Sequence, residues 1–191
     1  MKKLTLLFAL AAVALSAAPP PRVRLDVDGT AEKIDFQNVS LGAGLVRGQT
    51  PWVKEDARSS YLAVQTEDPL TSKWQTYEFN FIPRRSGTVR LMLRGTSTQK
   101  NGVLWIDYDR LEVYGAKCVN PSFEILEDGV FAGWTMRELN VRKDQINAAD
   151  GKNFIRCSHD FFAEQRIALK AGVRVTVRFR TRSAGFSSRR R

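Results

Sequence analysis

The sequence predicts an all-β protein of the β-sandwich class. Three runs alternate apolar and polar residues, namely "TYEFNF" from Thr76, "TVRLMLRG" from Thr88 and "VRVTVRFRTR" from Val173. Period-two patterning with β-branched and aromatic residues is typical of strands that bury one face. Turn-forming stretches such as "PRRSG", "QKNG", "EDG" and "KAG" separate the runs. Short strands joined by turns favour two packed sheets.

Each run is expected to bury one face and expose the other. The buried faces comprise Tyr77, Phe79 and Phe81, then Val89, Leu91 and Leu93, and finally Val173, Val175, Val177 and Phe179. In the run from Leu104 the apolar parity changes near Asp109 and Arg110, which predicts a β-bulge. Only residues 54–63 and 136–149 have sequences compatible with short helices, and neither carries a long apolar stripe.

Residues 1–17 have the layout of a secretory signal peptide. Lys2 and Lys3 precede the apolar stretch "LTLLFALAAVAL", and the small residues "SAA" follow it. That stretch is shorter than the roughly 20 residues needed to span a bilayer, so no membrane insertion is expected. Residues 18–29 then form a linker, and the mature chain is expected to be secreted or periplasmic.

The chain is basic, with a formal net charge of +10 at pH 7. This charge favours polyanionic partners such as acidic polysaccharides or anionic cell-envelope polymers. Nucleic acid is not an expected partner of an exported protein. The alternative interpretation is a solvated arginine-bearing strand face, followed by a basic tail over residues 184–191.

Two cysteines, Cys118 and Cys157, are expected in a compartment where disulfides persist. A bridge would close a loop of about 40 residues and stabilise the fold by about 3–4 kcal/mol. Two buried free thiols are the alternative, because the sequence does not supply the Cα separation that a bridge requires.

The mature chain contains a weak internal repeat. "FQNVSLGAG" echoes "CVNPSFEIL", and "WQTYEFNFIPRRSGTVRLMLRG" echoes "EQRIALKAGVRVTVRFRTR". The first copy continues into "GVLWIDYDRLEVYG", whereas the second has no such continuation. We therefore expect one β unit over residues 30–116 and a second over 117–183.

These motifs resemble the galactose-binding-like jelly rolls, in particular the carbohydrate-binding modules of the cellulose- and xylan-binding type. "CVNPSFE", "GW" and "AEQRIALKAGVRVTVRF" resemble the opening half of such a module, and "WQTYEFNF" with "WIDYDRLEV" resembles the closing half. Here the closing half comes first. The order is compatible with a complete module plus a truncated one, with one sandwich built from both halves in permuted order, or with a fragment of a longer protein. We favour the two halves packing on each other, because an open half-sandwich would expose strand edges and an apolar face.

The resemblance implies a jelly-roll fold and glycan binding through aromatic side chains. The candidates are Trp52, Tyr61, Trp74 and Trp134, while Trp105 lies in an apolar run and is interpreted as core. For any one of these rings, burial in the core is the competing interpretation.

Related modules hold a structural calcium ion, and the matching positions here are Asp107 and Glu124. Calcium takes six to eight oxygen ligands, so these two carboxylates alone do not complete a site. An ordinary carboxylate pair is the alternative.

Catalysis is not expected. The only histidine, His159, lies in "SHD", but neighbouring residues of a strand point to opposite faces and would not form a triad. Asp107 and Asp109 share one strand face about 7 Å apart, a spacing that a glycosidase tolerates, but nothing indicates a cleft around them.

The function expected from the sequence is a secreted, non-catalytic module that recognises a glycan through exposed aromatic residues. One alternative is a structural module of the cell envelope that docks an anionic partner through its arginine-rich face. Another is a truncated remnant of a larger secreted glycoside hydrolase.

Overall fold

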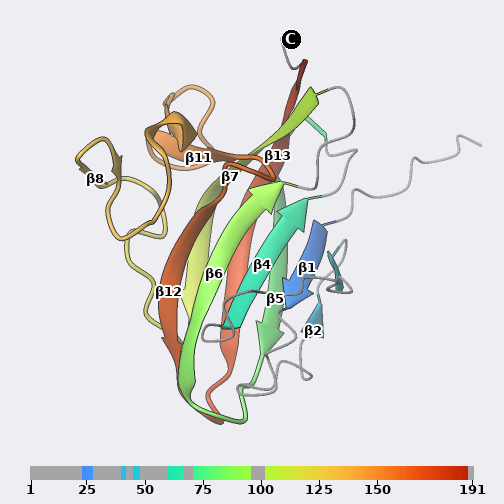
Figure 1. The fold of residues 1–191 in the computed structure, drawn as a ribbon, viewed down its shortest axis with the longest axis vertical. Helices are drawn as coiled ribbons and strands as arrows, with labels where there is room; N and C mark the ends of the chain where they lie inside the picture. Colours follow the sequence, from blue (N-terminus) through green and yellow to red (C-terminus); the bar gives the residue numbers. More distant parts are fainter. Residues whose placement is uncertain are drawn as a thin grey trace, which may run out of the picture.

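The fold is a two-layer β-sandwich in a computed structural model that describes residues 23–27, 40–41, 45–47, 60–66, 71–95 and 102–188. Within these residues the strands form a five-stranded sheet, a six-stranded sheet and a small two-stranded ribbon (Figure 1). The prediction of an all-β sandwich is therefore confirmed.

The five-stranded sheet has the order β12-β6-β4-β1-β3 and mixes parallel and antiparallel pairs. Its strands are β1 (Val23–Val27), β3 (Leu45–Arg47), β4 (Ser60–Thr66), β6 (Gly87–Gly95) and β12 (Ala163–Leu169).

The six-stranded sheet has the order β10-β11-β7-β13-β5-β2, and all of its pairs are antiparallel. Its strands are β2 (Ser40–Leu41), β5 (Gln75–Phe81), β7 (Gly102–Tyr114), β10 (Val141–Lys143), β11 (Asn153–Cys157) and β13 (Val175–Ser188). The ribbon pairs β8 (Leu126–Glu127) with β9 (Val130–Phe131).

Strands from the two sequence segments share both sheets. From the second segment, β12 pairs with β6 along seven residues, while β13 lies between β5 and β7. Neither sheet is built from one segment alone. The six-stranded sheet is thus continuous only when residues before and after 117 pair with each other, because β13 joins β7 to β5, whereas β12 extends one edge of the five-stranded sheet.

The predicted alternation buries the expected side chains. Phe79, Phe81, Val89, Leu91, Leu93, Val175, Val177 and Phe179 are fully buried, and Tyr77 nearly so, whereas Val173 precedes β13 and is half-buried. All of these residues except Val173 join Ile106, Tyr108 and Phe123 in one core between the sheets. The polar partners of the alternation consequently lie on the outer faces.

The predicted bulge in β7 is present. Across the β13–β7 pair, Arg178 faces Glu112 while Arg180 faces Asp109, so β7 carries one extra residue there. Arg110 takes a φ of 47°, and the buried parity changes from Tyr108 to Leu111 across it.

Neither expected helix forms in the described residues. Ser60 to Ala63 belong to strand β4, where they pair with β6. Residues 136–149 contain only a 3-10 turn at Glu138–Asn140, strand β10 and a loop. Without an apolar stripe, a helix here would gain little from packing, and residues 60–63 and 141–143 pair in sheets instead.

Candidate functional site

The outer face of the six-stranded sheet carries a row of charged residues across three strands. Glu78 of β5 pairs in register with Arg178 of β13, and Arg178 pairs with Glu112 of β7. The alternation that sends Phe79, Val177 and Phe179 inward sends these three side chains outward.

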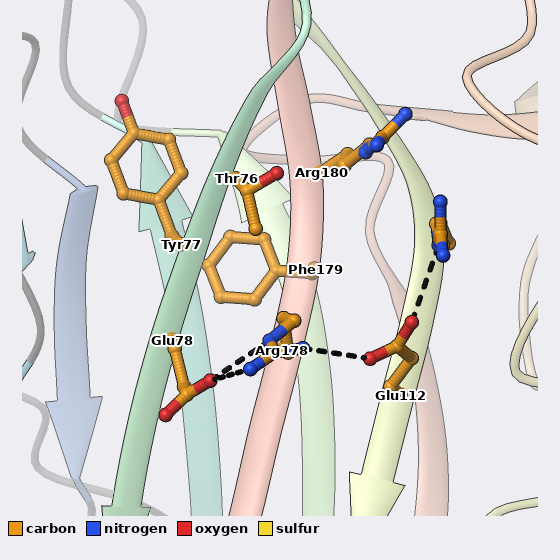
Figure 2. A pocket seen from close by; sticks show the side chains of 8 residues that line it. Thr76, Tyr77, Glu78, Glu112, Arg178, Phe179 and Arg180 are labelled. Atoms are coloured by element: carbon orange, nitrogen blue, oxygen red, sulfur yellow. Dashed lines mark hydrogen bonds and ion pairs between the residues drawn. The ribbon is translucent and has the colours of Figure 1, made fainter.

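A pocket of about 450 Å³ opens over this row. Figure 2 shows Arg178 at its centre with Glu78 and Glu112 on either side. It is lined by Thr76, Tyr77, Glu78, Arg110, Glu112, Arg178, Phe179 and Arg180. The rings of Tyr77 and Phe179 stack with centroids 5.9 Å apart and are buried.

An ion-pair network crosses the pocket. Arg178 contacts Glu78 at 2.7 Å and Glu112 at 3.5 Å, and Arg110 contacts Glu112 at 3.2 Å. The hydrogen bond to Glu78 raises the pKa of Arg178 above its usual value, so this guanidinium stays charged. The network fixes side chains that would otherwise be mobile on an exposed sheet face.

Arg180 lies at one end of the pocket and is held differently. Its Nη1 donates to the carbonyl of Ala149 at 3.2 Å, and its side chain is half-buried. Across the strand pair lies Asp109, whose buried carboxylate accepts the amides of Ala149 and Asp150 at 2.6 and 3.0 Å. Desolvation raises the pKa of Asp109 to about 6.

The neighbouring row of residues on this face places an aromatic ring, that of Tyr114, beside the pocket. Asn80, Thr176 and Tyr114 pair across the same three strands. Tyr114 is 56% exposed, and its hydroxyl donates to Glu112 at 3.1 Å. This hydrogen bond raises the pKa of Tyr114. Its ring is therefore an accessible apolar surface beside the charged row.

Of the aromatic residues predicted to bind glycan, Trp74 lies on this same outer face. Its ring makes an edge contact with Phe154 at 5.7 Å and is covered by the guanidinium of Arg182 at 4.4 Å. Its Nε1 donates to the carbonyl of Asn147 at 2.9 Å. Trp74 is half-buried and packs against Phe154 and Arg182 rather than presenting a free ring.

The other predicted aromatic residues are not gathered at one site. Trp134 is 5% exposed, packs on Phe123 and donates to the carbonyl of Asn120, so it belongs to the main core. Tyr61 lies on β4 in the opposite sheet, and its side chain is outside the described residues, as is all of Trp52. Trp105, interpreted as core, is half-buried instead and stacks on Phe161 at 5.8 Å.

The two residues matched to a calcium site have other partners. Asp107 is fully buried, and its oxygens contact Arg156 at 2.6 Å and Arg182 at 3.0 Å. Glu124 accepts the backbone amides of Lys152 and Asn153 at 2.9 and 3.0 Å. A cation at Asp107 would have to displace two guanidinium groups. Within the described residues no group of three or more His, Cys, Asp or Glu side chains is placed to hold a metal. The calcium ion stays a prediction.

The two cysteines are free thiols, so the bridge considered above is not formed. Cys157 is fully buried on β11, and Cys118 is half-buried against the same core. Burial raises the pKa of Cys118 to about 12 and that of Cys157 further. Each thiol is therefore accommodated as an apolar core group, which removes the need for a bridge.

The "SHD" segment departs from the expected geometry. Residues 158–160 follow β11 in a bend rather than in a strand, and His159 Nδ1 lies 2.8 Å from Asp160 Oδ1. Ser158 is buried, and its Oγ accepts the amide of Phe161 at 3.2 Å. The prediction that these three residues lie on a strand is thus wrong, and the Ser158 hydroxyl takes part in the hydrogen bonding of the bend.

The pocket residues were missed as a site because their rows depend on strand order. The alternation identified the arginine face of β13, but not that Glu78 and Glu112 would flank it. Comparison of the chain with protein-family models, curated proteins and solved structures found no significant match. Among the described residues no helix is both long and apolar enough to cross a membrane.

Proposed function

We propose that the protein is a secreted, non-catalytic carbohydrate-binding-type module that binds a glycan at the pocket on the six-stranded sheet. One observation carries this proposal: the row Glu78–Arg178–Glu112 has the exposed ring of Tyr114 beside it. Carboxylates accept and guanidinium groups donate hydrogen bonds, so the row offers both kinds of partner to sugar hydroxyls. The tyrosine ring offers a flat apolar surface for the face of a pyranose.

The rigidity of the pocket supports the same proposal. Its floor consists of three hydrogen-bonded strands that rest on a fully buried core. Side chains held by ion pairs on such a floor lose little conformational entropy when a ligand binds. The pocket volume of about 450 Å³ falls within the range of small-ligand sites.

A binding role fits the carboxylates better than a hydrolytic one. Glu78 and Glu112 both contact the guanidinium of Arg178. Asp107 and Asp109 are fully buried, and their oxygens are occupied by guanidinium and amide groups. A glycosidase needs one carboxyl group that is free to deliver a proton to the leaving group.

The jelly-roll type of the sandwich belongs to this proposal, as does the contribution of Trp52. Strands β12 and β13 of the opening-half motif "AEQRIALKAGVRVTVRF" pair with β5, β6 and β7 of the first segment, as one module would require. Trp52 lies outside the described residues. Its role in glycan binding stays a prediction that the same experiment can test.

The test is a glycan array, followed by affinity electrophoresis in the polysaccharide that the array shows to bind most strongly. Tyr114→Ala is expected to weaken binding about tenfold, because a stacked ring and its hydrogen-bonded hydroxyl are lost. The matched control is Ile125→Ala, which removes a side chain of similar exposure, 57% against 56%, from the loop before the β8–β9 ribbon. Trp52→Ala is measured beside them.

Absence of binding to every glycan on the array, with a native circular-dichroism spectrum, would refute the proposal. Release of reducing ends from a bound polysaccharide would refute its non-catalytic part.

A further inference from the structure

We propose that the pocket selects glycans that carry a carboxylate, with Arg180 as the group that binds it; this inference rests on the proposed function. The ligand class is an acidic saccharide, a chain containing uronic acid units. Some cations of the pocket already form ion pairs with acidic side chains, and one does not.

The central cations of the pocket are compensated. Arg178 contacts two glutamates, and Arg110 contacts one of them, Glu112, at 3.2 Å. A ligand carboxylate that approached Arg178 would meet two carboxylates within 3.5 Å of the same guanidinium. Like-charge contacts of this kind oppose binding, so the centre of the pocket is suited to neutral hydroxyl groups.

Arg180 is the pocket cation without an acidic partner. Within the part of the chain that the structure describes, no carboxylate lies within ion-pair distance of Arg180, and its Nη1 contacts only the carbonyl of Ala149. A guanidinium group has five N–H donors in a planar fork that matches a carboxylate. One donor is used on Ala149, and Arg180 lies at the end of the row of residues that line the pocket (Figure 2).

Two acidic residues lie near Arg180 and must be considered. Asp109 faces it across the strand pair, but its oxygens accept the amides of Arg110, Ala149 and Asp150. Asp150 itself is exposed and therefore well screened by water. Neither carboxylate occupies the donors of Arg180, although Asp109 lowers the local positive potential.

A second uncompensated cation lies directly before the start of the same strand. Arg174 is exposed and donates to Asn80 at 2.6 Å, again without an ion pair among the described residues. At about 3.4 Å per residue, it lies roughly 20 Å from Arg180 along β13. An acidic polymer long enough to cover the face would contact both cations, whereas a single acidic sugar would contact only Arg180.

The test compares acidic saccharides with their uncharged esters. Oligomers of galacturonate, glucuronate and mannuronate, and the methyl ester of each, are titrated into the full mature protein by calorimetry. The variants are Arg180→Gln, Arg180→Lys and, as control, Arg166→Gln, an exposed arginine on β12 of the other sheet. The ester keeps every other contact of its acid, so the pair isolates the charge.

We expect at least one acid to bind tenfold or more tightly than its ester. Arg180→Gln should weaken binding of the acid about 10- to 100-fold while leaving the ester unchanged, because a charge-assisted hydrogen bond is lost. The affinity of Arg180→Lys for the acid should lie between those of the wild type and Arg180→Gln, and the affinity of the Arg166→Gln control should match that of the wild type. Unchanged ester binding also shows that the variant is folded.

Equal binding of acids and esters would overturn this inference and leave the glycan-binding proposal standing. An equal loss of both ligands in Arg180→Gln would overturn it as well. Binding of no saccharide of either kind would overturn both proposals.

Discussion

The replacement Asp107→Asn tests how the six-stranded sheet holds its buried charge. Asp107 is fully buried on the outer face of β7, where its oxygens contact the Nε of Arg156 at 2.6 Å and the Nε of Arg182 at 3.0 Å. Arg182 in turn lies over the ring of Trp74 at 4.4 Å. Asparagine keeps the shape of the side chain but removes the charge that both guanidinium groups share.

The expected loss of unfolding free energy is about 2–4 kcal/mol. Removing one partner of a buried ion pair costs about 3–5 kcal/mol, because the remaining charge is left uncompensated. The arginine side chains are 26% and 15% exposed, so water recovers part of that cost. For a protein of this length, each kcal/mol lowers the melting temperature by about 2–4 °C, which predicts a decrease of about 5–15 °C.

The assay is denaturant unfolding and calorimetry, each with and without a calcium chelator. Asp128→Asn is the control, because Asp128 is exposed at a φ of 49°, a conformation that asparagine adopts readily. A destabilisation below about 1 kcal/mol by Asp107→Asn would refute the reasoning from the ion pairs. If the chelator lowers the melting temperature of the wild type and the variant no longer responds, Asp107 is instead the calcium ligand that the family resemblance implies.

Three further predictions address charge, backbone and thiols. The raised pKa of Asp109, about 6, means that the folded state binds this proton more tightly than the unfolded state. Its contribution to stability is present below about pH 4 and is lost as the pH rises to 6 and above. The unfolding free energy of the wild type relative to Asp109→Asn should therefore fall by up to about 3 kcal/mol between pH 4 and 7, and parallel pH profiles would contradict this. Gly115→Ala should destabilise by more than about 3 kcal/mol, because its φ is 81° and a Cβ would collide with the carbonyl of Arg174. Gly172→Ala, with a φ of 76° and open space around it, should cost only about 1 kcal/mol in the same denaturation assay; equal costs would refute the collision. Both cysteine thiols, whose pKa values burial raises, should react with a thiol reagent at pH 8 only after unfolding, and detection of no thiol in unreduced, unfolded protein would reveal a disulfide instead.

The alternation of residues was sufficient to predict the class of the fold and most of its core. Phe79, Leu91 and Val177 are fully buried where the period-two pattern predicts. The pattern also predicted the bulge, because a change of apolar parity in one strand requires an extra residue. It failed for Trp105, since its strand begins with consecutive apolar residues that give no alternation to interpret.

Strand order and side-chain partners could not be predicted in the same way. Periodicity is a local property, whereas β13 pairs with residues of β5 about 100 positions away and with residues of β7 about 70 positions away. Asp107, predicted as a calcium ligand, shows the consequence. Arg156 and Arg182, which contact it here, come from strands whose neighbours the sequence does not specify.

The pocket depends on that long-range pairing more than any other feature does. Glu78 and Glu112 come from the first sequence segment, and Arg178 and Arg180 from the second. Without β13 the two glutamates would face each other across an unfilled strand position, about 10 Å apart at 4.8 Å per strand. Without β5 and β7, Arg178 would lack both of its acidic partners and β13 would lack its neighbours. A glycan site at this pocket therefore requires both segments in one sandwich, and residues 71–116 expressed alone should bind no glycan even if strand structure persists.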